Sequence, residues 1–430
     1  MSALPIADRR RGWCPGVRRP METGDGLLVR LHPFGGRLTA NQARLIAEAA
    51  HKFGNGHLDV TARGNLQIRG VSDETYPDLL DLLEQGGLAE PEGDGPNRLT
   101  AVSPLAGLDP HDRFDALVLA EAIESETVSV DGLPAKFFVA VDGGGSIPLD
   151  AIGADLQLSG SEGDMVAFGT ASADGSRYIG TCFLNQAPAA AASIVSGFAR
   201  MRVEGRTEAG RLRDLAPELV REVVEQAGLE PPAFPLQRPA PRRAGVFETR
   251  KGKAVLLALP FGRCSSDQLA QAAHWSKRFG NGEIHLSFTR GILLPGIADR
   301  DVSTLIAEAS RAGFITEASD SRLSFLACPG KPDCTSALTD APSDALRIAD
   351  TCGENLAQGT FVHVSGCPKG CAHPGRADLT LVGRADGRYD VVPNGSPRDA
   401  SSLSLSIDEI MNRLLPNAAD LRRAFPERMR

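Results

Sequence analysis

The chain has 430 residues and a formal net charge of −8, with 42% hydrophobic and 23% charged residues. This composition is typical of a soluble globular protein of two to four domains, and its acidic balance argues against nucleic acid as the main partner. No apolar run approaches the ~20 residues that cross a bilayer, and the N-terminus lacks the apolar core of a secretory signal. We therefore expect a cytoplasmic protein with reduced thiols.

A repeated unit organises the chain, because residues 31–56 resemble residues 257–282 and both stretches end in FGNG. In the first copy we expect a strand at 27–31 and a helix starting near Thr39, followed by a hairpin at 58–68. A second helix is expected at 73–85, with four leucines directed inward. This β-α-β-β-α order is that of half a ferredoxin-like sandwich, so the fold class is α+β.

The repetition continues beyond this unit, since RLTAVSPLAG from Arg98 parallels RLSFLACPGK from Arg322 with a one-residue slip. Residues 138–160 then match residues 361–383 without a gap. We expect two ferredoxin-like half-domains and two larger α+β domains, related by pseudo-twofold symmetry and joined by a proline-rich linker. Their predicted bounds are 20–92 and 93–230 in the first half, 231–243 for the linker, and 244–316 and 317–430 in the second half.

Four cysteines occur in the second copy alone, spaced as C-x5-C and C-x3-C: Cys328, Cys334, Cys367 and Cys371. The first copy has Gly144 opposite Cys367 and Pro148 opposite Cys371. Four thiolates on two loops suit a [4Fe–4S] cluster or a tetrahedral zinc ion, and the longer first spacing favours iron–sulfur. A chance grouping of buried thiols is the remaining alternative. The other cysteines are expected to be packed thiols, with a local role most plausible for the first of them: Cys14, Cys182, Cys264 and Cys352.

This cysteine pattern on duplicated ferredoxin-like halves resembles the sulfite and nitrite reductase superfamily, in which a [4Fe–4S] cluster is coupled to sirohaem. The resemblance covers about residues 20–425 and is carried by SPLAGLDP (103–110), LPAKFFVAV (133–141) and CPKGCA (367–372). It implies that Cys371 is the thiolate between cluster and tetrapyrrole. It also implies an anion-binding role for Arg63, Arg98 and Lys136. The second lysine of the family pattern is replaced by Phe138, which argues against reduction of a small anion.

The segment RGWCPGVRRPMETGDGLLVRLHPFGG (11–36) resembles the precorrin-3B synthase branch of this superfamily. That resemblance implies an oxygen- and NADH-dependent monooxygenase of cobalamin biosynthesis, which hydroxylates precorrin-3A at C20 and closes a γ-lactone. The substrate is a tetrapyrrole with many carboxylates, which arginine forks bind well. The candidate substrate ligands are Arg63, Arg98, Lys136, Arg69, Arg290 and Lys369.

Cofactors and partners follow from the same resemblance, while no catalytic residue is assigned. Besides the cluster, it implies a mononuclear non-haem iron, for which His363 and His373 are weak candidates because no carboxylate completes a triad. No G-x-G-x-x-G follows a predicted strand, so NADH is expected to act through a separate reductase. The duplication makes a monomer plausible. Two alternatives stay open: a sirohaem-dependent sulfite or nitrite reductase, and a non-catalytic iron–sulfur or tetrapyrrole-binding protein.

Overall fold

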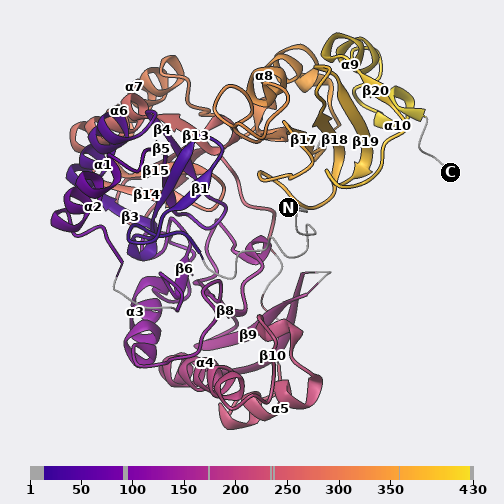
Figure 1. Ribbon diagram of the computed structural model, residues 1–430. Coiled ribbons are helices and arrows are strands. Elements are labelled where there is room, and N and C mark those ends of the chain that lie inside the picture. The colour runs from indigo at the N-terminus through magenta and orange to yellow at the C-terminus, as the bar shows by residue number, and fades with distance from the viewer. Residues whose placement is uncertain are drawn as a thin grey trace.

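The computed structural model describes residues 14–90, 95–172, 175–232, 235, 238–357 and 359–426. Within these residues the chain forms four five-stranded sheets. The two sheets of the half-domains lie together at the upper left of Figure 1, with one larger domain below them and the other to their right. The first residues of the motif at 11–36 and four residues of the linker lie outside the described residues.

The first half-domain has the expected order of elements. They are β1 (Met21–Thr23), β2 (Gly26–Leu31), α1 (Ala40–Phe53), β4 (His57–Val60), β5 (Leu66–Val71) and α2 (Tyr76–Gln85). Helix α1 begins where predicted because the Thr39 hydroxyl accepts from the Gln42 N–H and the Gln42 side chain accepts from the Thr39 N–H. Helix α2 begins later than predicted, because residues 72–75 form a hydrogen-bonded turn. Its Leu79 and Leu83 are buried, whereas the other two leucines are only partly buried.

The second half-domain repeats this order with β11 (Gly245–Glu248), β12 (Lys253–Ala258), α6 (Ser266–Phe279), β14 (Glu283–Ser287), β15 (Gly291–Ile297) and α7 (Asp299–Arg311). The two half-domains exchange one short strand each. Strand β13 (Arg263–Ser265) pairs with β4 of the first half, and β3 (Arg37–Thr39) pairs with β14 of the second. Helices α1 and α6 pack against each other, and buried residues of both halves form one hydrophobic core. Because each sheet is completed by a strand of the other half, the two half-domains form one structural unit.

The first larger domain consists of β6 (Thr100–Val102), α3 (Ala116–Thr127), β7 (Val139–Asp142), β8 (Leu156–Gly160), β9 (Met165–Ser172), β10 (Gly175–Phe183), α4 (Ala187–Val203) and α5 (Pro217–Gln226). The second consists of β16 (Phe325–Ala327), α8 (Ala341–Cys352), β17 (Val362–Ser365), β18 (Ala377–Gly383), β19 (Tyr389–Gly395), β20 (Ser404–Leu405), α9 (Ile407–Leu414) and α10 (Leu421–Ala424). In each sheet the first three strands run parallel and the next two antiparallel. This shared topology confirms the duplicated fold.

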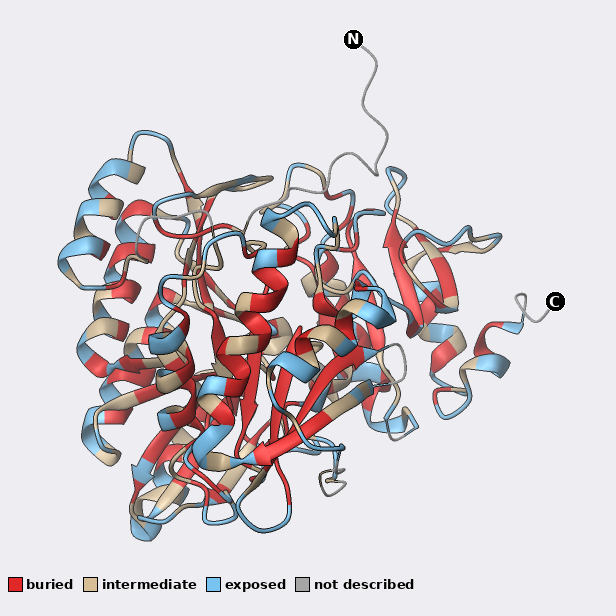
Figure 2. Ribbon diagram, turned by 90° about the horizontal axis from the view of Figure 1, so that it is seen from below, coloured by how far each residue is buried: buried red, intermediate tan, exposed pale blue. Residues whose placement is uncertain are grey.

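Buried residues concentrate on the strands and on the inward faces of the helices, whose outer faces are exposed (Figure 2). In the part of the chain that the structure describes, no helix has the length and apolarity needed to span a bilayer.

Candidate functional site

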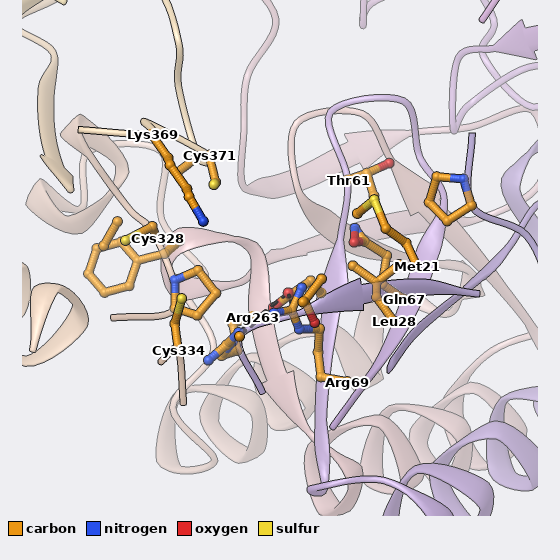
Figure 3. A pocket seen from close by; sticks show the side chains of 18 of the residues that line it. Met21, Leu28, Thr61, Gln67, Arg69, Arg263, Cys328, Cys334, Lys369 and Cys371 are labelled. Atoms are coloured by element: carbon orange, nitrogen blue, oxygen red, sulfur yellow. Dashed lines mark hydrogen bonds and ion pairs between the residues drawn. The ribbon is translucent and has the colours of Figure 1, made fainter. Parts of the chain in front are cut away.

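The two cysteine arms meet because of the parallel strands that precede them. Cys328 directly follows β16, and Cys367 lies two residues after β17. Since β16 and β17 are neighbouring parallel strands, their carboxyl ends lie at one edge of the sheet. All four predicted ligands, Cys334 and Cys371 included, line one cavity of about 720 Å³. Figure 3 shows three of them, Cys328, Cys334 and Cys371, facing Arg69, Gln67 and Thr61 across this cavity.

The donor set fits an iron–sulfur cluster. The Gly366 N–H donates a hydrogen bond to the Cys328 sulfur at 3.1 Å, which stabilises a thiolate. Burial, with the neighbouring thiols as a smaller cause, raises the pKa of Cys328 and of Cys371 in the metal-free chain. A bound iron centre reverses this effect, because its positive charge favours deprotonated ligands.

Among the described residues, no three His, Cys, Asp or Glu side chains lie close enough together to hold a single metal ion. In a [4Fe–4S] cluster each cysteine binds a different iron, so the four sulfurs need not converge on one point. The predicted mononuclear iron therefore has no assigned ligands. His363 is fully buried with neither ring nitrogen hydrogen-bonded, and burial, His373 and Arg290 lower its pKa to about 3. The His373 ring lies 5.8 Å away and donates to the Arg376 carbonyl oxygen.

A second chamber of about 290 Å³ shares Cys14, Arg30 and Lys136 with the main cavity. Its lining includes Arg30, Arg63, Arg98 and Lys136, and no described aspartate or glutamate. A concave surface with this excess of positive charge binds anions, and several cations spread along it suit a ligand with several carboxylates.

Three predicted substrate ligands line this chamber. The Arg63 guanidinium lies over the Phe138 ring at 4.0 Å and donates to the Lys136 carbonyl oxygen at 3.4 Å. Burial, and then Arg211, lowers the pKa of Arg63 to about 10, so it stays charged at neutral pH. Arg98 forms an ion pair with Glu124 at 2.6 Å, which leaves part of its guanidinium for a ligand. Lys136 lines both the chamber and the main cavity.

The other three predicted ligands line the main cavity. Arg69 donates twice to the Asp25 carboxylate, at 3.0 and 2.5 Å, so its charge is already compensated inside the protein. Lys369 donates to the Ser336 hydroxyl at 2.9 Å and thereby links the two cysteine arms. Arg290 donates to the Ala372 carbonyl oxygen at 3.0 Å, one residue beyond Cys371.

Two cavity residues have strained backbones, and both replace glycines of the first half. Arg290 has a φ of 66°, and Gly64 at the equivalent position has 67°. Phe261 has a φ of 57°, and its equivalent Gly35 has 60°. A left-handed conformation is unfavourable for residues with a Cβ, and such strain concentrates at functional sites. The second half thus keeps two large side chains on this cavity at a cost in stability.

Sequence reasoning missed Arg30 and His32, which both line the second chamber. Arg30 Nε and His32 Nδ1 are buried without a hydrogen-bond partner in the described structure. Burial, followed by Arg30 and Arg98, lowers the pKa of His32 to about 3, so its imidazole is neutral. The available signal was their spacing, because residues two apart on an extended segment share a face. Unpaired polar groups of this kind are costly unless a ligand or water binds them.

Three of the remaining cysteines are packed as predicted, namely Cys182, Cys264 and Cys352. Burial raises the pKa of Cys182 to about 11 and that of Cys264 to about 12, which keeps both thiols protonated. Cys14, by contrast, is half-buried and lines both cavities.

Comparison with known proteins assigns the family. The chain is 34% identical to a precorrin-3B synthase of Sinorhizobium sp. over 402 residues, which is 91% of this chain and 84% of that protein. The chain belongs to the precorrin-3B synthase family. The model of the nitrite/sulfite reductase ferredoxin-like half domain matches twice, at residues 19–86 and 247–312, as expected for a duplicated member of that family.

More distant relatives agree with this place in the superfamily. A ferredoxin–nitrite reductase of Synechococcus elongatus is 27% identical over 90% of this chain and 82% of its own length. The structure of the Mycobacterium tuberculosis NirA protein matches with a TM-score of 0.71 at 21% identity, covering 93% of this chain and 82% of that one. At that identity the likeness shows the fold alone, and it confirms the nitrite/sulfite reductase-like architecture.

Proposed function

We propose that the chain is an oxidoreductase that converts precorrin-3A to precorrin-3B. The overall reaction consumes precorrin-3A, O2, NADH and a proton, and yields precorrin-3B, NAD⁺ and water. One oxygen atom enters the macrocycle at C20, an acetate arm closes the γ-lactone, and the second oxygen atom leaves as water. The two electrons of NADH balance the reduction of that second atom.

One observation carries this proposal. The four cysteines line the main cavity, and the chamber lined by cations adjoins that cavity and shares lining residues with it. A tetrapyrrole is flat and apolar at its centre and carries carboxylates at its edge. The main cavity offers apolar contacts from Met21, Leu28 and Phe261. Cations surround it on several sides, so a polycarboxylate macrocycle is a ligand of suitable size and charge.

The contact between Arg63 and Phe138 favours a large anionic ligand over a small one. The Phe138 side chain is 3% exposed, and its ring lies under the Arg63 guanidinium. This contact fixes the guanidinium plane and adds no positive charge. Replacement of the second lysine by Phe138 therefore removes a cation from the chamber and orients one that remains. Arg63, Arg98, Lys136 and Arg30 are proposed to bind carboxylates in the chamber, and Arg290 to bind one in the main cavity. His32 is proposed to donate or accept a neutral hydrogen bond.

Cys328, Cys334, Cys367 and Cys371 are proposed to hold a [4Fe–4S] cluster, which supplies single electrons when bound. We further propose that an NADH-linked reductase delivers these electrons and that the reaction takes place in the cytoplasm, where the thiols stay reduced. A mononuclear non-haem iron at the substrate is part of the proposal, without ligands named from this chain.

The test uses the chain purified without oxygen and reconstituted with iron and sulfide. Its absorption spectrum is recorded first; an intrinsic sirohaem band would overturn the synthase proposal in favour of a reductase. Precorrin-3A, ¹⁸O2, NADH and a reductase are then added. We expect a product heavier by one labelled oxygen atom, detected by mass spectrometry. Binding of precorrin-3A without turnover would instead identify a tetrapyrrole-binding protein.

A further inference from the structure

The turn between β1 and β2, residues 23–26, belongs to the first half and contacts the arm of the second half that carries Cys334. The Gly24 carbonyl oxygen accepts a hydrogen bond from the Thr335 N–H at 3.0 Å. A Cβ added to Gly24 would lie 2.7 Å from the Cys334 sulfur and 2.7 Å from the Thr335 nitrogen. Gly24 does not have a positive φ, so the backbone conformation does not require glycine here. The close approach of Cys334 does.

The equivalent turn of the second half supports this interpretation. TGDG at 23–26 corresponds to TRKG at 249–252, so Arg250 stands where the first half has Gly24. This turn also contacts the large domain of the opposite half, because the Arg250 N–H donates to the Leu108 carbonyl oxygen at 2.9 Å. The Arg250 side chain then donates to the carbonyl oxygens of Asp109 and Asp112, each at 3.2 Å. A side chain is thus present opposite the loop without cysteines and absent opposite Cys334.

A second contact holds the same arm. The Asp333 carboxylate, next to Cys334, accepts from Arg263 at 2.9 Å and lies 3.6 Å from the His57 imidazole. Arg263 also donates to Asp59 of the first half at 2.8 Å. The side chains of Arg263 and Asp333 are 17% and 24% exposed, so solvent screens this pair less than a surface pair.

We propose that the 23–26 turn and the Arg263–Asp333 ion pair are positioning elements for Cys334. The turn belongs to the first half of the chain. Arg263 belongs to the second half, but Asp59 and the pairing of β13 with β4 hold it on the sheet of the first half. The binding of a cluster thus depends on the first half, although all four ligands belong to the second. This inference rests on the cluster assignment in the proposed function.

The main test compares Gly24→Ala with Gly210→Ala, a control glycine with no atoms near the added Cβ and no positive φ. Both variants are reconstituted with iron and sulfide. Iron and labile sulfide are counted, EPR spectra are recorded, and alkylation of Cys334 by iodoacetamide is followed by mass spectrometry. In Gly24→Ala the added methyl group overpacks the contact and displaces the arm that carries Cys334. We therefore expect incomplete clusters with the EPR signal of a three-iron centre. We also expect roughly tenfold faster alkylation of Cys334. The control should match the wild-type chain.

Asp333→Asn serves as a second variant, because it keeps the side-chain shape and removes the charge that pairs with Arg263. Its control is Asp386→Asn, which weakens an exposed ion pair with Arg384 in the same domain. We expect a shifted cluster reduction potential and faster Cys334 alkylation in Asp333→Asn alone. Wild-type spectra, cluster content and alkylation in both Gly24→Ala and Asp333→Asn would overturn the positioning role.

These measurements need no substrate, so the two proposals can fail separately. A wild-type chain that binds no cluster would overturn the cluster assignment, and this inference with it. A wild-type cluster that is unaffected by either variant would overturn this inference and leave the proposed function intact.

Discussion

Two loops at equivalent places in the two halves show how one scaffold serves two purposes. The loop at 103–112 of the first half is closed by protein contacts: His285 donates to the Pro104 carbonyl oxygen at 2.7 Å and Arg37 to that of Ala106 at 2.5 Å. The loop at 328–340 of the second half carries Cys328 and Cys334 and opens onto the main cavity. The first loop thus has its backbone oxygens bound by side chains of the half-domains, whereas the second loop presents two sulfurs to a cavity. A duplicated fold can therefore keep one site closed for stability and the other open for a cofactor.

The loops after β7 and β17 differ in the same way. In the first half Asp142 forms a two-fold ion pair with Arg238 of the linker, at 2.9 and 2.7 Å, and also accepts from the Gly144 and Leu149 N–H groups. In the second half Ser365 stands at the place of Asp142, and its hydroxyl donates to the Cys367 carbonyl oxygen at 2.8 Å. The first loop is held by an ion pair, and the second leads into Cys367 and Cys371, two of the proposed cluster ligands.

The largest expected effect comes from replacing Cys371, and the control replaces the equivalent residue of the first half. Cys371→Ser should lose the cluster and abolish turnover, because a serine oxygen is a poor ligand for iron in a cluster. Pro148→Ser changes the equivalent residue of the first half and should keep both cluster and turnover. The checks are iron and sulfide content and precorrin-3B formation. A Cys371→Ser chain with a full cluster and normal activity would show that the ligand assignment is wrong.

Removal of the Asp142 charge, which holds the loop after β7, should lower the free energy of unfolding without changing the cluster content. The Asp142 side chain is 3% exposed, and Asp142→Ala removes the main partner of the largely buried Arg238 guanidinium. We expect the free energy of unfolding to fall by about 3–5 kcal/mol, with unchanged iron content. Glu222→Ala, which breaks an exposed ion pair with Arg206 in the same domain, is the control and should change little. Urea unfolding measures both, and loss of cluster in Asp142→Ala would contradict the division between the two loops.

Arg290 offers a test that separates stability from binding. Arg290→Gly restores the residue that the first half has at Gly64 and relieves a left-handed backbone, at the loss of the hydrogen bond to Ala372. We expect the free energy of unfolding to stay level or rise by up to about 1 kcal/mol. The affinity for precorrin-3A, measured by fluorescence titration, should fall roughly tenfold through loss of a charge-assisted contact. Clear destabilisation with normal affinity would assign Arg290 a structural role instead.

The last prediction concerns the dependence of stability on pH. His363 has Ala140 as its equivalent, and burial lowers its pKa to about 3, so the folded chain holds it neutral. Between this pKa and the ordinary value of about 6.5, the unfolded chain binds a proton that the folded chain does not. Stability is therefore lost as pH falls through that window. His363→Ala should lessen the slope of unfolding free energy against pH by up to about 1.4 kcal/mol per unit. Equal slopes from urea unfolding between about pH 4 and 6 would show that His363 titrates normally.

The sequence by itself determined the features that depend on local chemistry. The repeat at 31–56 and 257–282, the cap at Thr39 and the paired cysteine spacings are all legible along the chain. The duplicated α+β fold followed from them, as did the expectation that the two cysteine arms form one site. Resemblance to known motifs then supplied the family.

Only the tertiary structure decided which distant groups meet. Strands β3 and β13 have three residues each, too few to show an alternating pattern, so their exchange between the halves was not predicted. Three further contacts were not predicted either. They are the ion pair of Arg69 with Asp25, the position of Arg30 and His32 in the second chamber, and the close approach of Gly24 to Cys334. Such contacts depend on how separate elements pack, which no periodicity along the chain records. The sequence thus shows which residues carry the chemistry, while packing decides which of them remain available to a ligand.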